Sequence, residues 1–72
     1  MPNNNIDLLT PREIECGKWL ILGKTADETA TILGLSRRTV EDHLASMKTK
    51  LGCNNKVRLA IKLFEQGVDT TS

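Results

Sequence analysis

Basic side chains gather in the middle of this 72-residue chain, and clustered lysine and arginine are suited to binding phosphate. Residues 36–58 hold six cationic side chains against two anionic ones, a net charge of +4, although the whole chain carries only +1. Residues 1–35 sum to −2 and residues 59–72 to −1. This uneven distribution predicts a surface that faces nucleic acid; the alternative is an ordinary solvated helix face.

The sequence offers little support for catalysis or metal binding. Cys16, Cys53 and the single histidine, His43, lack the spacing of a metal site. We find no nucleophile–base pair, carboxylate pair or glycine-rich phosphate loop, and so short a chain leaves no room for a deep cleft. We therefore expect a protein that is not an enzyme and uses no cofactor or metal. No apolar run reaches the roughly 20 residues of a membrane span, and no signal peptide is evident, which predicts a cytoplasmic protein without membrane contact.

Capping residues and glycines divide the chain into four helices. Capping boxes, in which a threonine is followed three residues later by a glutamate, open the first two helices, and scarce aromatic residues argue against sheet. We predict an all-α fold, a compact four-helix bundle that contains a helix-turn-helix, over residues 9–67. Residues 1–8 are predicted to be a disordered lead or linker remnant, and residues 68–72 a polar tail. The predicted caps are Thr10, Thr25, Ser36 and Asn54 or Asn55, and the predicted stops are Gly23, Gly34, Gly52 and Gly67.

The third predicted helix, residues 37–51, follows the second after a short turn that contains glycine, as in a helix-turn-helix. Its apolar stripe, which must face the core, consists of Val40, Leu44, Met47 and Leu51. In a major groove, arginine is suited to guanine, a carboxylate can accept from the cytosine amino group, and alanine can touch the thymine methyl. The base-reading candidates on the opposite face are Arg38, Glu41, Asp42, Ala45 and Thr49.

Further residues around this helix are candidates for contacts with the DNA backbone. The free amides near Ser36 could hold a phosphate. Glu41 and Asp42 place negative charge in front of DNA, which predicts weaker non-specific affinity and more selective binding; alternatively, they only complement the helix dipole. The backbone candidates are Lys24, Thr25, Ser36, Arg37, Lys48, Lys50 and Lys56.

The fourth predicted helix, about residues 55–66, is apolar on two sides. One stripe must pack on the bundle, which leaves the other for a partner, and the pattern does not decide between them. A two-fold dimer would match a palindromic DNA site. The dimer-interface candidates are Val57, Ala60, Ile61 and Phe64 on one stripe, and Leu59 and Leu63 on the other.

Several segments, in this order, resemble the LuxR-type (LuxR/FixJ) helix-turn-helix domain: Leu9-Thr10-Pro11-Arg12-Glu13, Ile32-Leu33-Gly34-Leu35-Ser36, Thr39-Val40 with His43, and Lys50-Leu51-Gly52. The resemblance covers residues 9–67. Trp19 with Gly23-Lys24-Thr25 is similar to the quorum-sensing branch, whose members bind acyl-homoserine lactones.

The resemblance implies a third helix that recognises bases, a fourth helix that forms a homodimer, and palindromic promoter sites on double-stranded DNA. RNA polymerase is a further candidate partner. A signal ligand would bind a sensor domain and not this segment.

The chain departs from the family pattern at Gly17 and Thr29, where large aliphatic residues are usual. We expect both to shrink the core, with Ile21 refilling part of the first gap. Two other functions stay open. One is a protein-interaction module that titrates a regulator through the fourth helix without binding DNA. The other is a sigma-factor-like domain that associates with RNA polymerase.

Overall fold

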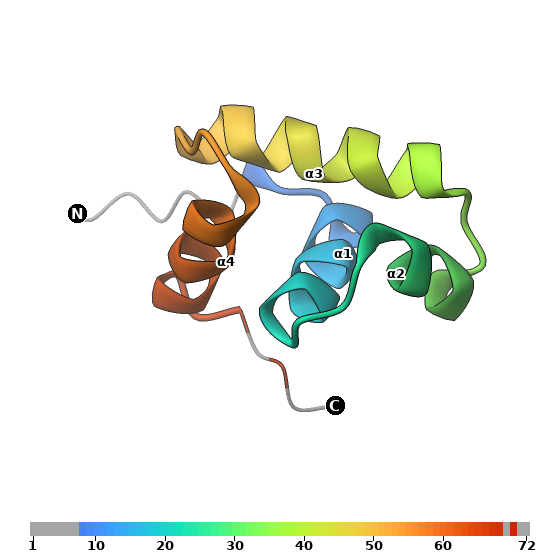
Figure 1. Ribbon diagram of the computed structural model, residues 1–72. Coiled ribbons are helices and arrows are strands. Elements are labelled where there is room, and N and C mark those ends of the chain that lie inside the picture. The colour runs from blue at the N-terminus through green and yellow to red at the C-terminus, as the bar shows by residue number, and fades with distance from the viewer. Residues whose placement is uncertain (1–7, 69, 71–72) are drawn as a thin grey trace.

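The computed structural model describes residues 8–68 and 70, and these form four helices without a strand. The helices are α1 (Pro11–Ile21), α2 (Ala26–Leu33), α3 (Arg37–Leu51) and α4 (Lys56–Glu65). Figure 1 shows α3 running along one side of the domain, with α1, α2 and α4 gathered beneath it. The predicted all-α four-helix fold is confirmed. None of the helices within the described residues has the length and apolar character needed to cross a membrane.

The helix boundaries follow from local hydrogen bonds that the sequence predicts. At the start of α1, the Glu13 amide donates to Thr10 Oγ1 at 3.2 Å while the Thr10 amide donates to Glu13 Oε1 at 2.8 Å. Thr25 and Glu28 repeat this capping box at α2. Asn55 caps α4, with Oδ1 accepting from the Arg58 amide at 2.8 Å. These bonds satisfy amide groups that a helix start leaves without partners.

The turn between α2 and α3 consists of residues 34–36. Gly34 has a φ of 70°, a conformation that side chains with a Cβ rarely adopt. The Leu35 amide then donates to the Ala30 carbonyl at 2.9 Å, and Ser36 Oγ caps α3 by accepting from the Thr39 amide at 3.0 Å. Together these contacts close α2 and open α3 within three residues, which is the helix-turn-helix geometry.

The core lies beneath α3. The predicted stripe of α3 is confirmed, since Val40, Leu44, Met47 and Leu51 are all buried. They pack in one cluster with residues from the other three helices, among them Cys16, Ala30 and Leu59.

Gly17 brings α1 and α4 into close approach and leaves no gap. A Cβ built at Gly17 would lie 2.8 Å from Leu63 Cδ1, so the Leu63 side chain occupies the space that a larger residue would fill. The expectation of a gap at Gly17 that Ile21 partly refills was therefore wrong, because the Leu63 side chain of α4 fills the space.

The core extends one residue beyond the predicted boundary at Gly67. Val68, predicted to lie in the polar tail, is buried, and its amide donates to the Leu63 carbonyl at 3.1 Å. A hydrophobic residue directly after a helix-ending glycine commonly packs back onto its own helix, which explains the placement. The rest of the predicted lead and tail, apart from Leu8 and Thr70, lies outside the described residues.

Candidate nucleic-acid interface

The outer face of α3 holds all five base-reading candidates. Arg38, Asp42, Ala45 and Thr49 are exposed, and Glu41 is half-buried. The buried stripe fixes this orientation, because it holds the opposite side of α3 against the core. In Figure 1, no described element covers the outer face of α3. Side chains along several turns of one helix are therefore free to meet a ligand.

The two acidic candidates on this face are paired with arginines. Arg38 Nε lies 3.6 Å from Asp42 Oδ1, and Arg37 Nε lies 3.1 Å from Glu41 Oε2. Arg37 also reaches Asp27 of α2, with Nη1 to Oδ2 at 3.6 Å. The hydrogen bond to Glu41, with the charges of Asp27 and Glu41, raises the pKa of the Arg37 guanidinium. Neither acid lies in the first turn of α3, which argues against the helix-dipole alternative.

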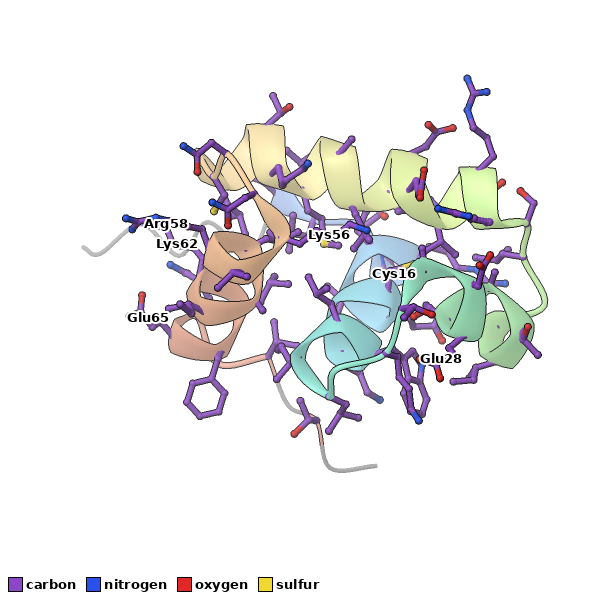
Figure 2. All side chains as sticks on the ribbon, in the orientation of Figure 1. Cys16, Glu28, Lys56, Arg58, Lys62 and Glu65 are labelled. Atoms are coloured by element: carbon purple, nitrogen blue, oxygen red, sulfur yellow. The ribbon has the colours of Figure 1, made fainter. Side chains whose placement is uncertain are left out.

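Most backbone candidates surround the first half of α3. Lys24, Arg37 and Lys56 line one hollow, and Lys48 and Lys56 line a neighbouring one together with Arg38 and Asp42. Figure 2 shows Lys56 beneath α3, between the start of α4 and α1. Three separate segments thus bring cations to the same side of the domain.

Thr25 and Ser36 also lie on this side, but their side chains already serve the fold. Thr25 Oγ1 accepts from the Glu28 amide at 3.1 Å, and Ser36 Oγ accepts from the Thr39 amide. A phosphate, which accepts hydrogen bonds, can therefore meet the remaining free amides of these helix starts and the O–H donors of the same hydroxyls.

The structure gives Lys50, one of the DNA-backbone candidates, a role within the fold. Lys50 Nζ binds both carboxylate oxygens of Glu13, at 2.9 and 3.1 Å, and so joins the end of α3 to the start of α1. Burial would raise the pKa of Glu13, but hydrogen bonds from Ser46, Lys50 and the Thr10 amide, with the Lys50 charge, lower it to about 2. Lys50 therefore neutralises the carboxylate of Glu13, which is nearly buried.

A model of the family described as "Bacterial regulatory proteins, luxR family" matches residues 7–63. The chain belongs to this family. The resemblance predicted from the sequence is confirmed, and the molecule is a helix-turn-helix DNA-binding domain of luxR-family regulators.

Individual relatives agree with this assignment. The "HTH-type quorum sensing-dependent transcriptional regulator VjbR" of Brucella ovis is 39% identical over 66 residues, which cover 92% of this chain and 26% of VjbR. The "Transcriptional activator protein AnoR" of Acinetobacter nosocomialis is 43% identical over 60 residues, 83% of this chain and 25% of AnoR. The luxR-family domain thus spans about a quarter of the length of these relatives.

A solved structure shows the same fold. The structure titled "Crystal structure of the phage VqmA-DPO complex" matches with a TM-score of 0.80 and 33% identity, over 89% of this chain and 29% of that one.

In this luxR-family domain, α4 has one buried and one exposed apolar stripe. Leu59 and Leu63 are completely buried within the domain, so their inclusion among the dimer-interface candidates was wrong. Val57, Ile61 and Phe64 are 71%, 53% and 68% exposed. The close approach at Gly17 draws the Leu63 side into the core and turns the other stripe outward.

Charged residues accompany the exposed stripe. Ala60, the fourth member of that stripe, is half-buried. Figure 2 shows Arg58, Lys62 and Glu65 on the side of α4 that faces away from the other helices. The outer surface of α4 is therefore an apolar stripe with charged neighbours, unlike the polar outer face of α3.

Proposed function

We propose that this luxR-family domain recognises specific DNA sequences by placing α3 in the major groove. The observation that carries the proposal is the arrangement of α3, which buries one stripe and presents all five base-reading candidates on its uncovered face. An α-helix fits the major groove, where each base pair presents a distinct pattern of donors and acceptors.

Arg38 is the first candidate for reading a base. Its side chain is 87% exposed, and its weak contact with Asp42 at 3.6 Å can be exchanged for a bidentate contact with guanine. Asp42 is then free to accept from the amino group of a neighbouring cytosine. Ala45 and Thr49 lie on the same exposed face, where the alanine methyl can meet a thymine methyl.

The surrounding cations hold the DNA backbone in this proposal. Lys24 and Lys56 supply ammonium groups near the first half of α3, Lys48 supplies one nearer its end, and the starts of α2 and α3 supply amides. Arg37 contributes once it is released from Glu41. Each phosphate that is neutralised adds to the salt dependence of binding. Because a bacterial chromosome lies in the cytoplasm, a protein with this function would act there.

The exposed stripe of α4 supplies a homodimer contact in the same proposal. Val57, Ile61 and Phe64, with Ala60 beside them, can pack on the same residues of a second copy across a two-fold axis. Such a dimer matches palindromic promoter sites with half-sites about 34–36 Å apart, one turn of DNA. Contact with RNA polymerase would follow at the promoter.

Fluorescence anisotropy with labelled duplexes tests the DNA proposal. A palindromic library and scrambled DNA are titrated at two salt concentrations, and we expect tight binding to a selected palindrome that weakens as salt rises. Failure of the folded protein to bind any duplex at low salt would overturn the proposal.

An Arg38→Ala variant then separates base reading from phosphate contact. Loss of a guanine contact should reduce discrimination at one base pair by about 1–3 kcal/mol. Equal loss of affinity on every sequence would instead make Arg38 a phosphate contact. Lys62→Ala, on α4, is the control and should leave base discrimination unchanged.

The homodimer is tested by Phe64→Ser, which alters an exposed residue and should leave the fold intact. We expect affinity for a full palindrome to fall while affinity for an isolated half-site stays unchanged. Equal affinity of variant and wild type for the full palindrome would remove α4 from the dimer contact.

A second candidate function also rests on the exposed stripe of α4. The domain could titrate a regulator by pairing through Val57, Ile61 and Phe64 without binding DNA itself. This alternative gains support if the folded protein binds no duplex but associates with a regulator that has a matching helix.

A further inference from the structure

A hollow of about 270 Å³ opens between α1, α2, α3 and the start of α4. The floor consists of Cys16, Leu20, Ala26, Thr29 and Leu44. Figure 2 labels two of the residues that line it, Cys16 on α1 and Lys56 at the start of α4. The proposed DNA contacts involve the rim of this hollow and leave its floor unused.

The floor is apolar apart from one hydroxyl group. Cys16 is buried, and burial raises the pKa of its thiol, so the sulfur carries no charge at neutral pH. Thr29 is only 3% exposed, and no buried side-chain oxygen or nitrogen in the described part of the chain lacks a hydrogen-bond partner, so its hydroxyl is not an orphaned group. Thr29 nevertheless lines the hollow, where its hydroxyl can bond to a bound molecule.

The rim carries an excess of positive charge. Its two acids, Asp27 and Glu41, are both paired with Arg37, at 3.6 and 3.1 Å. Lys24 and Lys56 also line the rim, and neither makes an ion pair within the described part of the chain. These two ammonium groups are free to hold an anion above an apolar floor.

We propose that this hollow binds a small aromatic carboxylate with a hydroxyl group at the opposite end of its ring. The ring lies on the apolar floor, the carboxylate meets Lys24 and Lys56, and the ligand hydroxyl bonds to Thr29. The size is adequate, because an apolar cavity of about 150 Å³ already accepts benzene.

Such a ligand would compete with DNA, because Lys24 and Lys56 are also proposed backbone contacts. This regulatory consequence rests on the proposed DNA-binding function. Binding of the ligand itself does not, so the two proposals can fail separately.

Amide chemical shifts of the 72-residue protein, recorded during titration with 4-hydroxybenzoate, test the site without DNA. We expect saturable shifts at Cys16, Thr29 and Leu44. Thr29→Val should weaken 4-hydroxybenzoate about 3- to 10-fold, the factor of one hydrogen bond, and leave benzoate, which lacks the hydroxyl, unchanged. Thr29→Ile, which fills the floor, should abolish both, and Lys56→Gln should weaken both.

Three results would overturn the site. They are no saturable shift with 4-hydroxybenzoate, equal binding of the neutral 4-hydroxybenzamide, or the same shifts with inorganic phosphate alone. If Thr29→Ile unfolds the protein, as circular dichroism would show, the Thr29→Val comparison still decides the role of the hydroxyl.

The DNA consequence is tested in the anisotropy assay. Addition of 4-hydroxybenzoate should lower the DNA affinity of the wild type but not of Thr29→Ile, which lies outside the proposed DNA contacts. Saturable ligand shifts without any DNA binding would refute the DNA function and leave the ligand site standing. DNA binding unaffected by saturating ligand would refute the competition.

Discussion

The two ends of α3 carry the same kind of ion pair in opposite surroundings. Near its C-terminal end, Lys50 Nζ lies 2.9 Å from Glu13 Oε1, and the Glu13 side chain is only 4% exposed. In its N-terminal half, Arg38 and Asp42 are 3.6 Å apart, with side chains 87% and 68% exposed. One pair connects two helices within the fold, whereas the other connects neighbouring turns of one helix in water.

This difference separates residues that hold the fold from residues that can bind a ligand. A nearly buried carboxylate that loses its partner keeps its desolvation cost, so breaking such a pair is expensive. An exposed pair contributes about 0–1 kcal/mol, because water and salt screen it. Arg38 can therefore exchange Asp42 for DNA at little cost, whereas Lys50 cannot leave Glu13.

The largest expected effect is that of Glu13→Ala. This change removes the partner of Lys50 and half of the Thr10 capping box, so unfolding should become easier by about 2–4 kcal/mol. Urea denaturation followed by circular dichroism measures the loss. Glu15→Ala is the matched control on the same helix, since it breaks an exposed pair with Arg12, and it should change stability by less than about 1 kcal/mol. Equal losses for both variants would refute the distinction between the two kinds of pair.

The second prediction concerns the stability of the fold at low pH. Folding lowers the pKa of Glu13 from 4.5 to about 2, so its stabilising contribution is complete above pH 4.5 and is lost as pH falls through 2. Urea denaturation across this range should show the wild type losing stability steadily. Glu13→Gln should start lower at neutral pH and show a flatter profile. Parallel profiles for the two proteins would assign the acid sensitivity to other groups.

Lys50 and Lys48 provide the third test, because both are lysines near the end of α3 and only one is paired with Glu13. Lys50→Met should reduce stability by about 1–3 kcal/mol, since Glu13 loses a charged hydrogen-bond partner. Lys48→Met should keep the stability and instead lower the salt slope of DNA binding by about 0.9. The opposite pattern would return Lys50 to the DNA backbone.

Local patterns in the sequence were sufficient for the helices and the turn. A capping box such as that of Thr10 and Glu13 acts within four residues, and so does the αL turn at Gly34, so both can be predicted without the fold. The buried stripe of α3 follows equally from helical periodicity. For the same reason the outer face of α3 could be predicted, because it is the side opposite that stripe.

The pair between Lys50 and Glu13 could not be predicted in this way. The two residues are 37 positions apart, and each already had a local explanation, as a phosphate contact and as a capping residue. The sides of α4 posed a similar problem, because either stripe could have been buried. The close contact between Gly17 and Leu63 decides which stripe of α4 is buried, and no local pattern links those two residues.

The smallest expected effect on stability is that of Asp42→Asn, which tests the exposed end of α3. Because the pair with Arg38 is exposed, stability should change by less than about 1 kcal/mol. DNA binding should change more, since removal of a negative charge from the proposed interface reduces repulsion of phosphate and frees Arg38. We expect higher affinity for scrambled DNA at low salt and a smaller preference for the selected palindrome.

Glu65→Gln, on the side of α4 away from α3, removes the same charge elsewhere and should leave both affinities unchanged (Figure 2). Equal gains for Asp42→Asn and Glu65→Gln would mean that only the net charge of the protein matters. A gain confined to Asp42→Asn would show that this carboxylate suppresses binding to wrong sequences. Asp42 would then act on DNA selectivity without holding the fold as Glu13 does.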